Sequence, residues 1–223
     1  FKKEKEKTLV IYTPAIPADL MEYIYFKEMG YTIVKRSLAL GVIAKEKRTL
    51  AVAGTHGKTT TSTILAHILE SSGRGCNAFL GGISKNYHTN LLLSNSDLLV
   101  AEADEFDRSF LQLWPQTAII TSADADHLDI YNDYETIKRA FEDFASQVSG
   151  TLILKKGAGI DAENVSKAKV LYYSYDQKCD FYASEIKVQQ GGYFRYTLNY
   201  PGGSINNCTV GIPGWVNVEN ARS

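Results

Sequence analysis

The chain has 223 residues, which is enough for one large domain or for one domain and part of another. With 44% hydrophobic and 22% charged residues, it has the composition of a globular protein with a buried core. Its 24 Lys and Arg residues balance 25 Asp and Glu residues, so the net charge of −1 provides no general attraction to nucleic acid or to an anionic membrane surface. Any anion that the protein binds must be held by a local site.

The three cysteines, Cys76, Cys179 and Cys208, are widely spaced and lack the CxxC spacing of a metal site. We interpret them as free thiols in a reducing compartment and expect a cytoplasmic protein, because disulfides persist mainly in oxidising compartments. No apolar run approaches the roughly 20 residues that span a bilayer, so no membrane partner is expected. Residues 1–7 have neither an initiator Met nor the apolar core of a signal peptide, which indicates a sequence that begins inside a longer protein.

The first predicted elements form a short β-α-β fragment. Residues 8–12 are a strand-like run, and Asp19 is expected to cap a helix that continues to about Met29 and stops at Gly30. Residues 31–34 are strand-like again. The fragment is too short to be a domain alone, so we assign residues 1–48 to the C-terminal part of a truncated, Rossmann-like first domain.

A second unit is predicted over residues 49–223. Its first strand, residues 50–53, is uninterruptedly apolar, and further strands are expected at residues 97–101, 117–120 and 151–154, the first two of them buried. Two helices lie between these strands. The first ends at Gly73, and the second has a possible capping box of Asn132 and Glu135. The apolar positions expected to face the core are Ile64, Leu65, Ile68 and Leu69 in the first helix, and Ile137, Ala140, Phe141, Phe144 and Val148 in the second.

This alternation of strands and helices predicts an α/β fold, with a mostly parallel sheet and helices on both faces. After residue 170 the sequence changes to β-rich segments that are separated by Gly, Asp and Asn. These segments predict an extension of strands, several of them antiparallel, along the edge of the domain.

The motif with the most specific chemistry is a phosphate-binding loop at residues 53–60, between a buried strand and a helix. Gly54 and Gly57 let backbone N–H groups turn toward one anion, and the helix N-terminus adds partial positive charge. Lys58 is expected to face solvent in the empty loop and to reach the β- and γ-phosphates, while the Thr59 hydroxyl binds Mg²⁺. Val52 stands where the general GxxxxGK[ST] pattern has Gly. The alternative is a Gly-rich turn that precedes Lys-Thr by coincidence.

Two polar segments follow neighbouring buried strands and should emerge at the same rim of the sheet. In residues 100–107, Glu102 leaves the apolar strand first and is the preferred Mg²⁺ ligand, although an acidic cluster alone is more often a solvated loop. In residues 121–129, His127 is a second metal ligand or a contact of the transferring phosphoryl group, unless it is a surface residue. Asn217, near the end of the chain, either caps a helix or pairs with adenine.

These segments, in this order, resemble the Mur ligase family. The family pattern GTxGKTT appears as residues 54–60, and EADExDxSF appears as residues 102–110. ADHxDxY appears as residues 125–131, and PGxHNVxNA appears as residues 213–221 with Val216 in place of His. Val52 is normal in this family, and residues 13–17 resemble the end of its first domain. His56 is typical of the members that add L-alanine and of their recycling relatives.

The resemblance implies that residues 1–48 end a UDP-binding domain, that residues 49–223 are the central ATP-binding domain, and that a C-terminal domain is missing. It implies ATP and Mg²⁺ as cofactors and UDP-N-acetylmuramate and L-alanine as substrates, with an acyl phosphate as intermediate. Lys58 and His127 would be catalytic, Thr59, Glu102 and His127 would bind Mg²⁺, and Asn90 and His127 would contact the substrate. The implied nucleotide-binding residues are Gly54, Thr55, His56, Gly57, Lys58, Thr59, Thr60, Asn217 and Asn220.

Two alternatives remain at this point. One is a ligase that recycles a murein tripeptide, although residues 105–110 and 124–131 are more similar to the alanine-adding members. The other is a P-loop module or switch without ligase activity. We further expect the 223-residue chain alone to bind ATP weakly and to catalyse nothing, because the domain that closes over ATP supplies much of the positioning.

Overall fold

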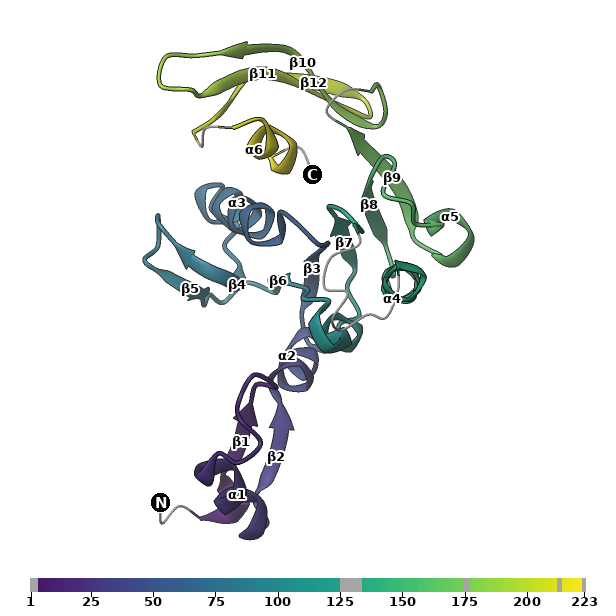
Figure 1. Ribbon diagram of the computed structural model, residues 1–223. Coiled ribbons are helices and arrows are strands. Elements are labelled where there is room, and N and C mark those ends of the chain that lie inside the picture. Colours follow the sequence, from purple (N-terminus) through teal and green to yellow (C-terminus); the bar gives the residue numbers. More distant parts are fainter. Residues whose placement is uncertain (1–3, 125–133, 175–176, 212–213, 222–223) are drawn as a thin grey trace.

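A ten-stranded sheet forms the centre of the protein (Figure 1). The structure is a computed structural model that describes residues 4–124, 134–174, 177–211 and 214–221. The strands, in their order across the sheet, are β12 (Gly203–Val210), β11 (Phe194–Tyr200), β10 (Phe181–Val188), β9 (Lys169–Ser174), β8 (Thr151–Lys155), β7 (Thr117–Ile120), β3 (Arg48–Ala53), β6 (Leu98–Glu102), β4 (Asn77–Ser84) and β5 (Thr89–Leu92).

The sheet is mostly parallel, as predicted. All neighbouring pairs from β10 across to β4 are parallel. The antiparallel pairs are β4 with β5 at one edge, and β10 with β11 and β11 with β12 at the other. The predicted β-rich extension is therefore a continuation of the same sheet. The sequence analysis did not predict β4, β5 or the short helix α5 (Ala162–Val165).

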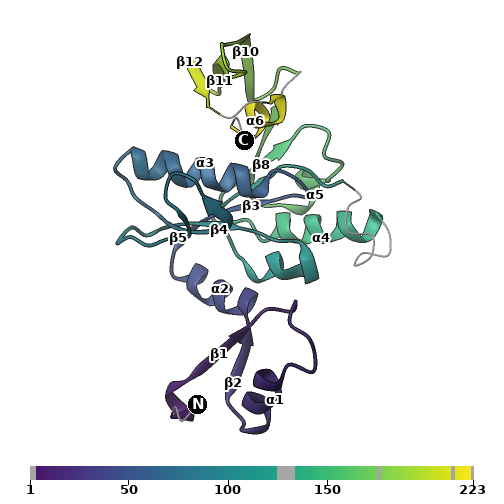
Figure 2. The same cartoon turned by 60° about the vertical axis from the view of Figure 1, so that its left-hand side comes forward.

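Helices cover both faces of the sheet, as Figure 2 shows for α3 (Lys58–Ser71) on one side and α4 (Tyr134–Ser146) on the other. Strand β6 shows how a strand of this sheet is covered on both of its faces. Leu98 and Val100 belong to the core cluster under α3, whereas Leu99 and Ala101 belong to the cluster under α4. A strand that is buried on both faces must be apolar at every position, which is the pattern that identified these strands in the sequence.

The face that α3 presents to the sheet differs from the prediction. Leu65 and Leu69 pack against the core cluster on that side, but Ile68 is 56% exposed. The fully buried positions of α3 are the small residues Thr61, Ser62 and Ala66. Small side chains let the helix lie close to the sheet. The prediction used only the large apolar residues of α3, and it therefore assigned the buried face to the wrong side of these small residues.

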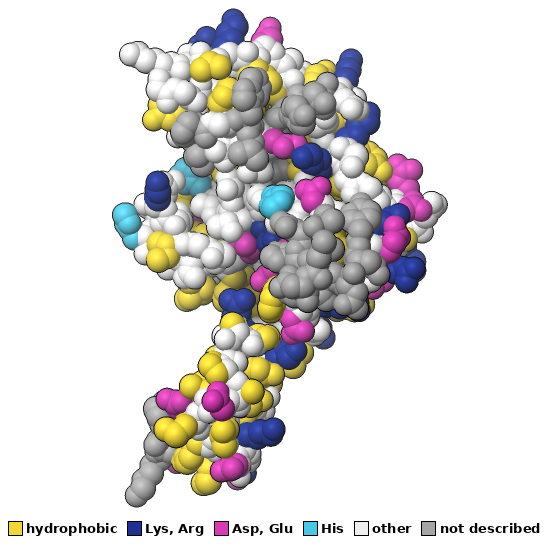
Figure 3. Space-filling view, in the orientation of Figure 1, with side chains coloured by type: hydrophobic (Ala, Val, Ile, Leu, Met, Phe, Trp, Pro, Cys, Tyr) yellow, Lys and Arg dark blue, Asp and Glu magenta, His cyan; other side chains and the backbone are white. Residues whose placement is uncertain are grey.

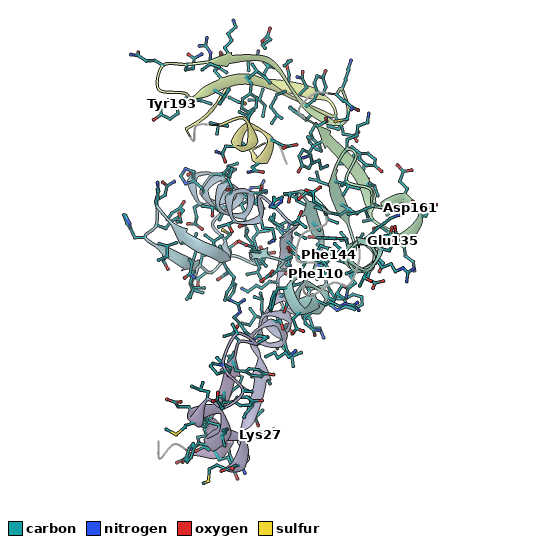
Figure 4. The ribbon with its side chains drawn as sticks, viewed as in Figure 1. Lys27, Phe110, Glu135, Phe144, Asp161 and Tyr193 are labelled. Atoms are coloured by element: carbon teal, nitrogen blue, oxygen red, sulfur yellow. The ribbon has the colours of Figure 1, made fainter. Side chains whose placement is uncertain are left out.

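The predicted core positions of α4 are confirmed, because Ile137, Ala140, Phe141 and Phe144 are buried, and Val148 is buried just beyond the end of the helix at Ser146. Three phenylalanine rings form the centre of this core. Phe110 stacks on Phe144 with ring centroids 5.0 Å apart and meets Phe141 edge-on at 5.3 Å. Figure 4 shows Phe110 and Phe144 pointing toward one another. Asn132, the predicted cap of this helix, lies outside the described residues.

We expect Phe144→Ala to lower the free energy of unfolding by about 4 kcal/mol, because it leaves a cavity and removes an aromatic stack. Urea unfolding followed by tryptophan fluorescence would measure the loss. Phe106, which is 42% exposed, provides the matched control, and Phe106→Ala should cost less than about 1 kcal/mol. Equal losses for the two variants would contradict a core centred on the phenylalanine cluster.

The N-terminal residues form a small unit below the sheet (Figure 1). Its strands β1 (Leu9–Tyr12) and β2 (Thr32–Lys35) are parallel, and it contains η1 (Lys5–Lys7) and α1 (Met21–Glu28). Asp19 does not cap α1. A turn from Pro17 to Leu20 makes Leu20 the N-cap residue, so Asp19 lies within the turn. Gly30 ends the helix region with φ of +66°, as expected.

The helix α2 (Arg36–Lys45) follows β2 and was not predicted. It connects the small unit to the main sheet, because Ala44 lies in the core cluster under α4. Gly41 packs directly on η2 (Phe106–Gln112), where a Cβ atom would lie 2.6 Å from the Gln112 carbonyl oxygen. Apolar side chains are spread over the surface of the small unit (Figure 3). No helix among the described residues is long and apolar enough to cross a membrane.

Cys76, Cys179 and Cys208 form no disulfide in the part of the chain that the structure describes, and they differ in burial. Cys76 is completely buried, and burial, with a further contribution from the charge of Glu70, raises the pKa of its thiol to about 11. Cys179 and Cys208 are partly exposed.

We expect a disulfide reagent at pH 8 to label Cys179 and Cys208 in the native protein and Cys76 only after unfolding, because the thiolate is the reactive form. The raised pKa also means that the stability due to the neutral Cys76 thiol is fully present below the pKa of the unfolded chain and is lost as the pH rises toward 11. The amount of thiolate that the reagent releases, measured before and after denaturant is added, gives the number of labelled cysteines and would test this expectation. Rapid reaction of all three thiols in the native state would contradict it.

Candidate functional site

The phosphate-binding loop lies between β3 and α3, as the sequence predicts. Gly54 and Gly57 both have positive φ, +130° and +82°, and α3 begins at the next residue, Lys58. The N-terminal backbone N–H groups of α3 are therefore presented to the space above the loop, which is the arrangement that binds phosphate. Among the other residues of the motif, Thr55 is buried, whereas His56 and Thr59 are exposed and Thr60 is half-buried.

The residues after β7 hold this loop in place. The Ser122 hydroxyl accepts a hydrogen bond from the His56 backbone N–H at 3.0 Å and lies 2.7 Å from the Thr55 hydroxyl. The Thr121 hydroxyl bonds to the carbonyl oxygens of Ala53 and His56. The predicted common rim is thus present for residues 121–124. His127, the candidate second metal ligand, lies outside the described residues.

Lys58 does not face solvent, contrary to expectation. Its side chain is only 14% exposed. The ammonium group donates to the Gly54 carbonyl oxygen at 2.7 Å and to Glu105 Oε1 at 3.0 Å, and it lies 2.8 Å from Glu105 Oε2. The loop lysine is therefore held by an ion pair before any phosphate arrives.

Glu105 is a site residue that the sequence analysis missed. Its side chain is 2% exposed, so the carboxylate is one of the most buried charged groups described. The pairing with β3 continues past the end of β6, with the Ala103 backbone N–H donating to the Val52 carbonyl oxygen, and Glu105 follows two residues later. The acidic run contained the signal, but its spacing did not show which of the carboxylates after Glu102 pairs with Lys58.

Glu102 lies beside Thr59, as expected for two ligands of one cation. The Thr59 hydroxyl donates to Glu102 Oε1 at 3.0 Å, and the Gly81 backbone N–H donates to Oε2 at 2.8 Å. A carboxylate and a hydroxyl oxygen suit Mg²⁺, which binds few protein oxygens and keeps several waters. No group of three or more His, Cys, Asp or Glu residues suited to a metal occurs within the described ranges. The pair therefore fits a cation that shares its coordination with phosphate and water.

A cleft of about 390 Å³ adjoins this pair on the side of α2. Glu102 and Asn90 both line it, so the candidate metal ligand and the candidate substrate contact share one space. The other lining residues come from β1, α2, β4, β5 and the region around η2, and they are Ile11, Arg36, Ser37, Ala39, Leu40, Ile43, Phe79, Leu80, Gly81, Leu91, Asp104, Ser109, Phe110 and Leu113.

The helix α6 (Trp215–Asn220) carries the two candidate adenine contacts, Asn217 and Asn220. Figure 1 shows it between the β10–β12 strands and α3. Val218 is fully buried beneath those strands, and Glu219 pairs with Lys155 at 3.0 Å. Asn220 is buried, and a Cβ atom on Gly57 would lie 2.6 Å from its side-chain oxygen. Asn217 is half-buried on the same helix.

Comparison with known families gives one match over most of the chain. The family model described as the Mur ligase middle domain matches residues 52–223. A UDP-N-acetylmuramate–L-alanine ligase from Porphyromonas gingivalis is 53% identical over 218 residues, which cover 96% of this chain and 48% of the relative. A ligase of the same name from Parabacteroides distasonis is 48% identical over 223 residues, again covering 48% of the relative. The chain thus spans about half the length of these curated relatives.

Solved structures show the same fold. The crystal structure of a UDP-N-acetylmuramate–alanine ligase from Thermotoga maritima superposes with a TM-score of 0.82 at 26% identity, covering 95% of this chain and 48% of that one. A UDP-N-acetylmuramate:L-alanyl-γ-D-glutamyl-meso-diaminopimelate ligase from Neisseria meningitides gives a TM-score of 0.80 at 22% identity, covering 96% and 71%. At this lower identity the likeness concerns the fold alone.

Proposed function

The chain belongs to the Mur ligase family, and on that premise we propose that the protein joins L-alanine to the carboxylate of UDP-N-acetylmuramate while ATP is cleaved to ADP and phosphate. The observation that carries this proposal is the position of Glu102, which touches Thr59 of the phosphate-binding loop and also lines the cleft. A nucleotide on the loop and an acceptor in the cleft would meet at this residue.

The loop is the proposed site of the ATP phosphates. Gly54, Thr55, His56, Gly57 and Thr60 shape it, and its backbone N–H groups would bind the β- and γ-phosphates. Lys58 would stabilise the negative charge that develops on the transferring phosphoryl group, at a position already fixed by Glu105 and the Gly54 carbonyl oxygen.

Thr59 and Glu102 are the proposed protein ligands of Mg²⁺, and His127 is the proposed ligand of a second Mg²⁺. A divalent cation at this position would neutralise phosphate charge and so allow an anionic acceptor to approach. Asn217 and Asn220 are proposed to contact adenine, because both lie on α6, Asn220 of α6 lies against Gly57 of the loop, and an amide offers both a donor and an acceptor.

Asn90 is proposed to contact the sugar nucleotide, since it lines the same cleft as Glu102.

In the first step of the proposed reaction, an oxygen of the lactyl carboxylate attacks the γ-phosphorus, the bond to the β-phosphate oxygen breaks, and ADP leaves. In the second step, the amino group of L-alanine attacks the acyl phosphate, and phosphate leaves from the tetrahedral intermediate. The amine proton is released as the amide forms.

The domain assignment is also a proposal. Residues 1–48 would complete a UDP-binding domain and residues 49–223 the central ATP-binding domain, with L-alanine bound through a further domain. The protein would act in the cytoplasm, in the synthesis of peptidoglycan precursors. The 223-residue chain alone would bind ATP weakly and turn over no substrate.

The test is release of ADP by the full-length protein in the presence of UDP-N-acetylmuramate, with either L-alanine or the murein tripeptide as the amine. Release that depends on L-alanine supports the proposal. Release only with the tripeptide would identify a recycling ligase instead, and ATP binding without release in either reaction would favour the P-loop module that lacks ligase activity.

A further inference from the structure

The carboxylate of Glu102 is held by β4 as well as by Thr59. Its two oxygens have different partners, because Oε1 accepts from the Thr59 hydroxyl at 3.0 Å and Oε2 accepts from the Gly81 backbone N–H at 2.8 Å. Strand β4 is hydrogen-bonded to β6, the strand that ends at Glu102. A neighbouring strand therefore fixes the direction in which the carboxylate points.

This contact leaves no room for a side chain at position 81. A Cβ atom on Gly81 would lie 2.4 Å from both carboxylate oxygens of Glu102 and 2.5 Å from its carboxyl carbon. The φ angle of Gly81 is not positive, so its backbone conformation is open to other residues. The requirement for glycine at this position thus arises from Glu102 and not from the backbone.

We propose that Gly81 is a positioning residue that directs the Glu102 carboxylate toward Thr59 and thereby sets the affinity of the site for Mg²⁺. The inference rests on the proposed function, which assigns Glu102 and Thr59 to the cation. Groups that orient metal ligands typically change metal affinity by about 10- to 100-fold when they are altered. Gly81 makes no contact with nucleotide in this account and acts through Glu102 alone.

A methyl group at position 81 should disturb the site and spare the fold. The atoms that it would displace are the far end of a half-exposed glutamate side chain, which can rotate away at little cost. Rotation would break the contacts with Gly81 and Thr59 and remove the carboxylate from the cation position. Gly81→Ala should therefore change Mg²⁺ binding much more than stability.

The experiment measures binding of a non-hydrolysable ATP analogue to the full-length protein by calorimetry, once with excess Mg²⁺ and once with EDTA. The dissociation constant in EDTA divided by the dissociation constant in Mg²⁺ reports the coupling between cation and nucleotide. For Gly81→Ala we expect this ratio to fall by about 10- to 100-fold, with the constant in EDTA unchanged. The melting temperature of the metal-free protein should shift by less than about 3 °C.

Gly82→Ala is the matched control on the same strand. Its Cβ atom would lie 3.3 Å from the Thr59 methyl carbon and near no carboxylate, so the ratio should change by less than about threefold. An unchanged ratio in Gly81→Ala, an equal loss in EDTA, or an equal effect of Gly82→Ala would each overturn the inference. If the unaltered protein binds no nucleotide in either buffer, the proposed function itself fails.

Discussion

Lys58→Ala should reduce turnover by on the order of 10³-fold and should also lower the free energy of unfolding by about 3 kcal/mol. The loss of turnover follows from the proposed role of the ammonium group at the γ-phosphate. The loss of stability follows from Glu105, whose carboxylate is 2% exposed and would be left without its cation. Steady-state ADP release and urea unfolding measure the two effects separately.

The second ion pair of similar geometry provides the control. Lys35 Nζ lies 2.7 Å from Asp107 Oδ2, but the two side chains are 46% and 41% exposed. Lys35→Ala should therefore cost much less stability than Lys58→Ala, because water replaces the lost partner. Both substitutions remove one ammonium group from one carboxylate, and Lys58→Ala also removes the hydrogen bond to the Gly54 carbonyl oxygen.

The double variant Lys58→Ala, Glu105→Gln separates the two roles of Lys58. Glutamine carries no charge, so most of the lost stability should return, whereas turnover should stay low because the ammonium group is still missing. Stability equal to that of Lys58→Ala alone would contradict the view that an uncompensated carboxylate causes the loss. Recovery of turnover would remove Lys58 from the reaction.

The architecture around the loop could be predicted because it depends on local patterns. Strand β6 is apolar from Leu98 to Ala101 since both of its faces are covered there, and the Gly-rich loop follows β3 directly. Parallel strands that are followed by polar residues bring those residues to one rim. Within the described residues, this rim is found at Glu102 and at residues 121–124, and Glu102 lies beside Thr59 of the loop.

The features that were missed depend on contacts between distant segments. The position of Glu102 at the end of the strand selected it as the cation ligand, but nothing in residues 103–105 shows that Glu105 pairs with Lys58, because that contact depends on the path of the chain after β6. Gly81 appears in the sequence as half of a Gly-Gly pair, and only its distance from Glu102 gives it a role. Likewise, α2 was missed because several of its apolar residues are exposed, so its sequence shows no clear division into an apolar face and a polar face.

Gly54→Ala should destabilise the protein by about 3 kcal/mol or more and abolish nucleotide binding. Its φ of +130° lies in a region that L-residues rarely adopt, which alone costs on the order of 1–3 kcal/mol. The added Cβ atom would also lie 2.1 Å from the Thr121 hydroxyl and 2.8 Å from the Ser122 backbone nitrogen. These atoms follow the central strand β7 and hold the loop, so relief of the overlap must displace the loop itself.

The variant Gly73→Ala separates the cost of backbone strain from the cost of steric overlap by the added Cβ atom. Gly73 also has a positive φ, +76°, but no atom lies within 4 Å of the position that a Cβ would take. The control should therefore lose only about 1 kcal/mol and keep its nucleotide affinity. Urea unfolding and calorimetric titration of ATP would compare the two variants, and a Gly54→Ala protein that fails to fold agrees with the expectation. If Gly54→Ala loses no more stability than Gly73→Ala and still binds ATP, then the close packing of the loop against the end of β7 is not what shapes the phosphate site.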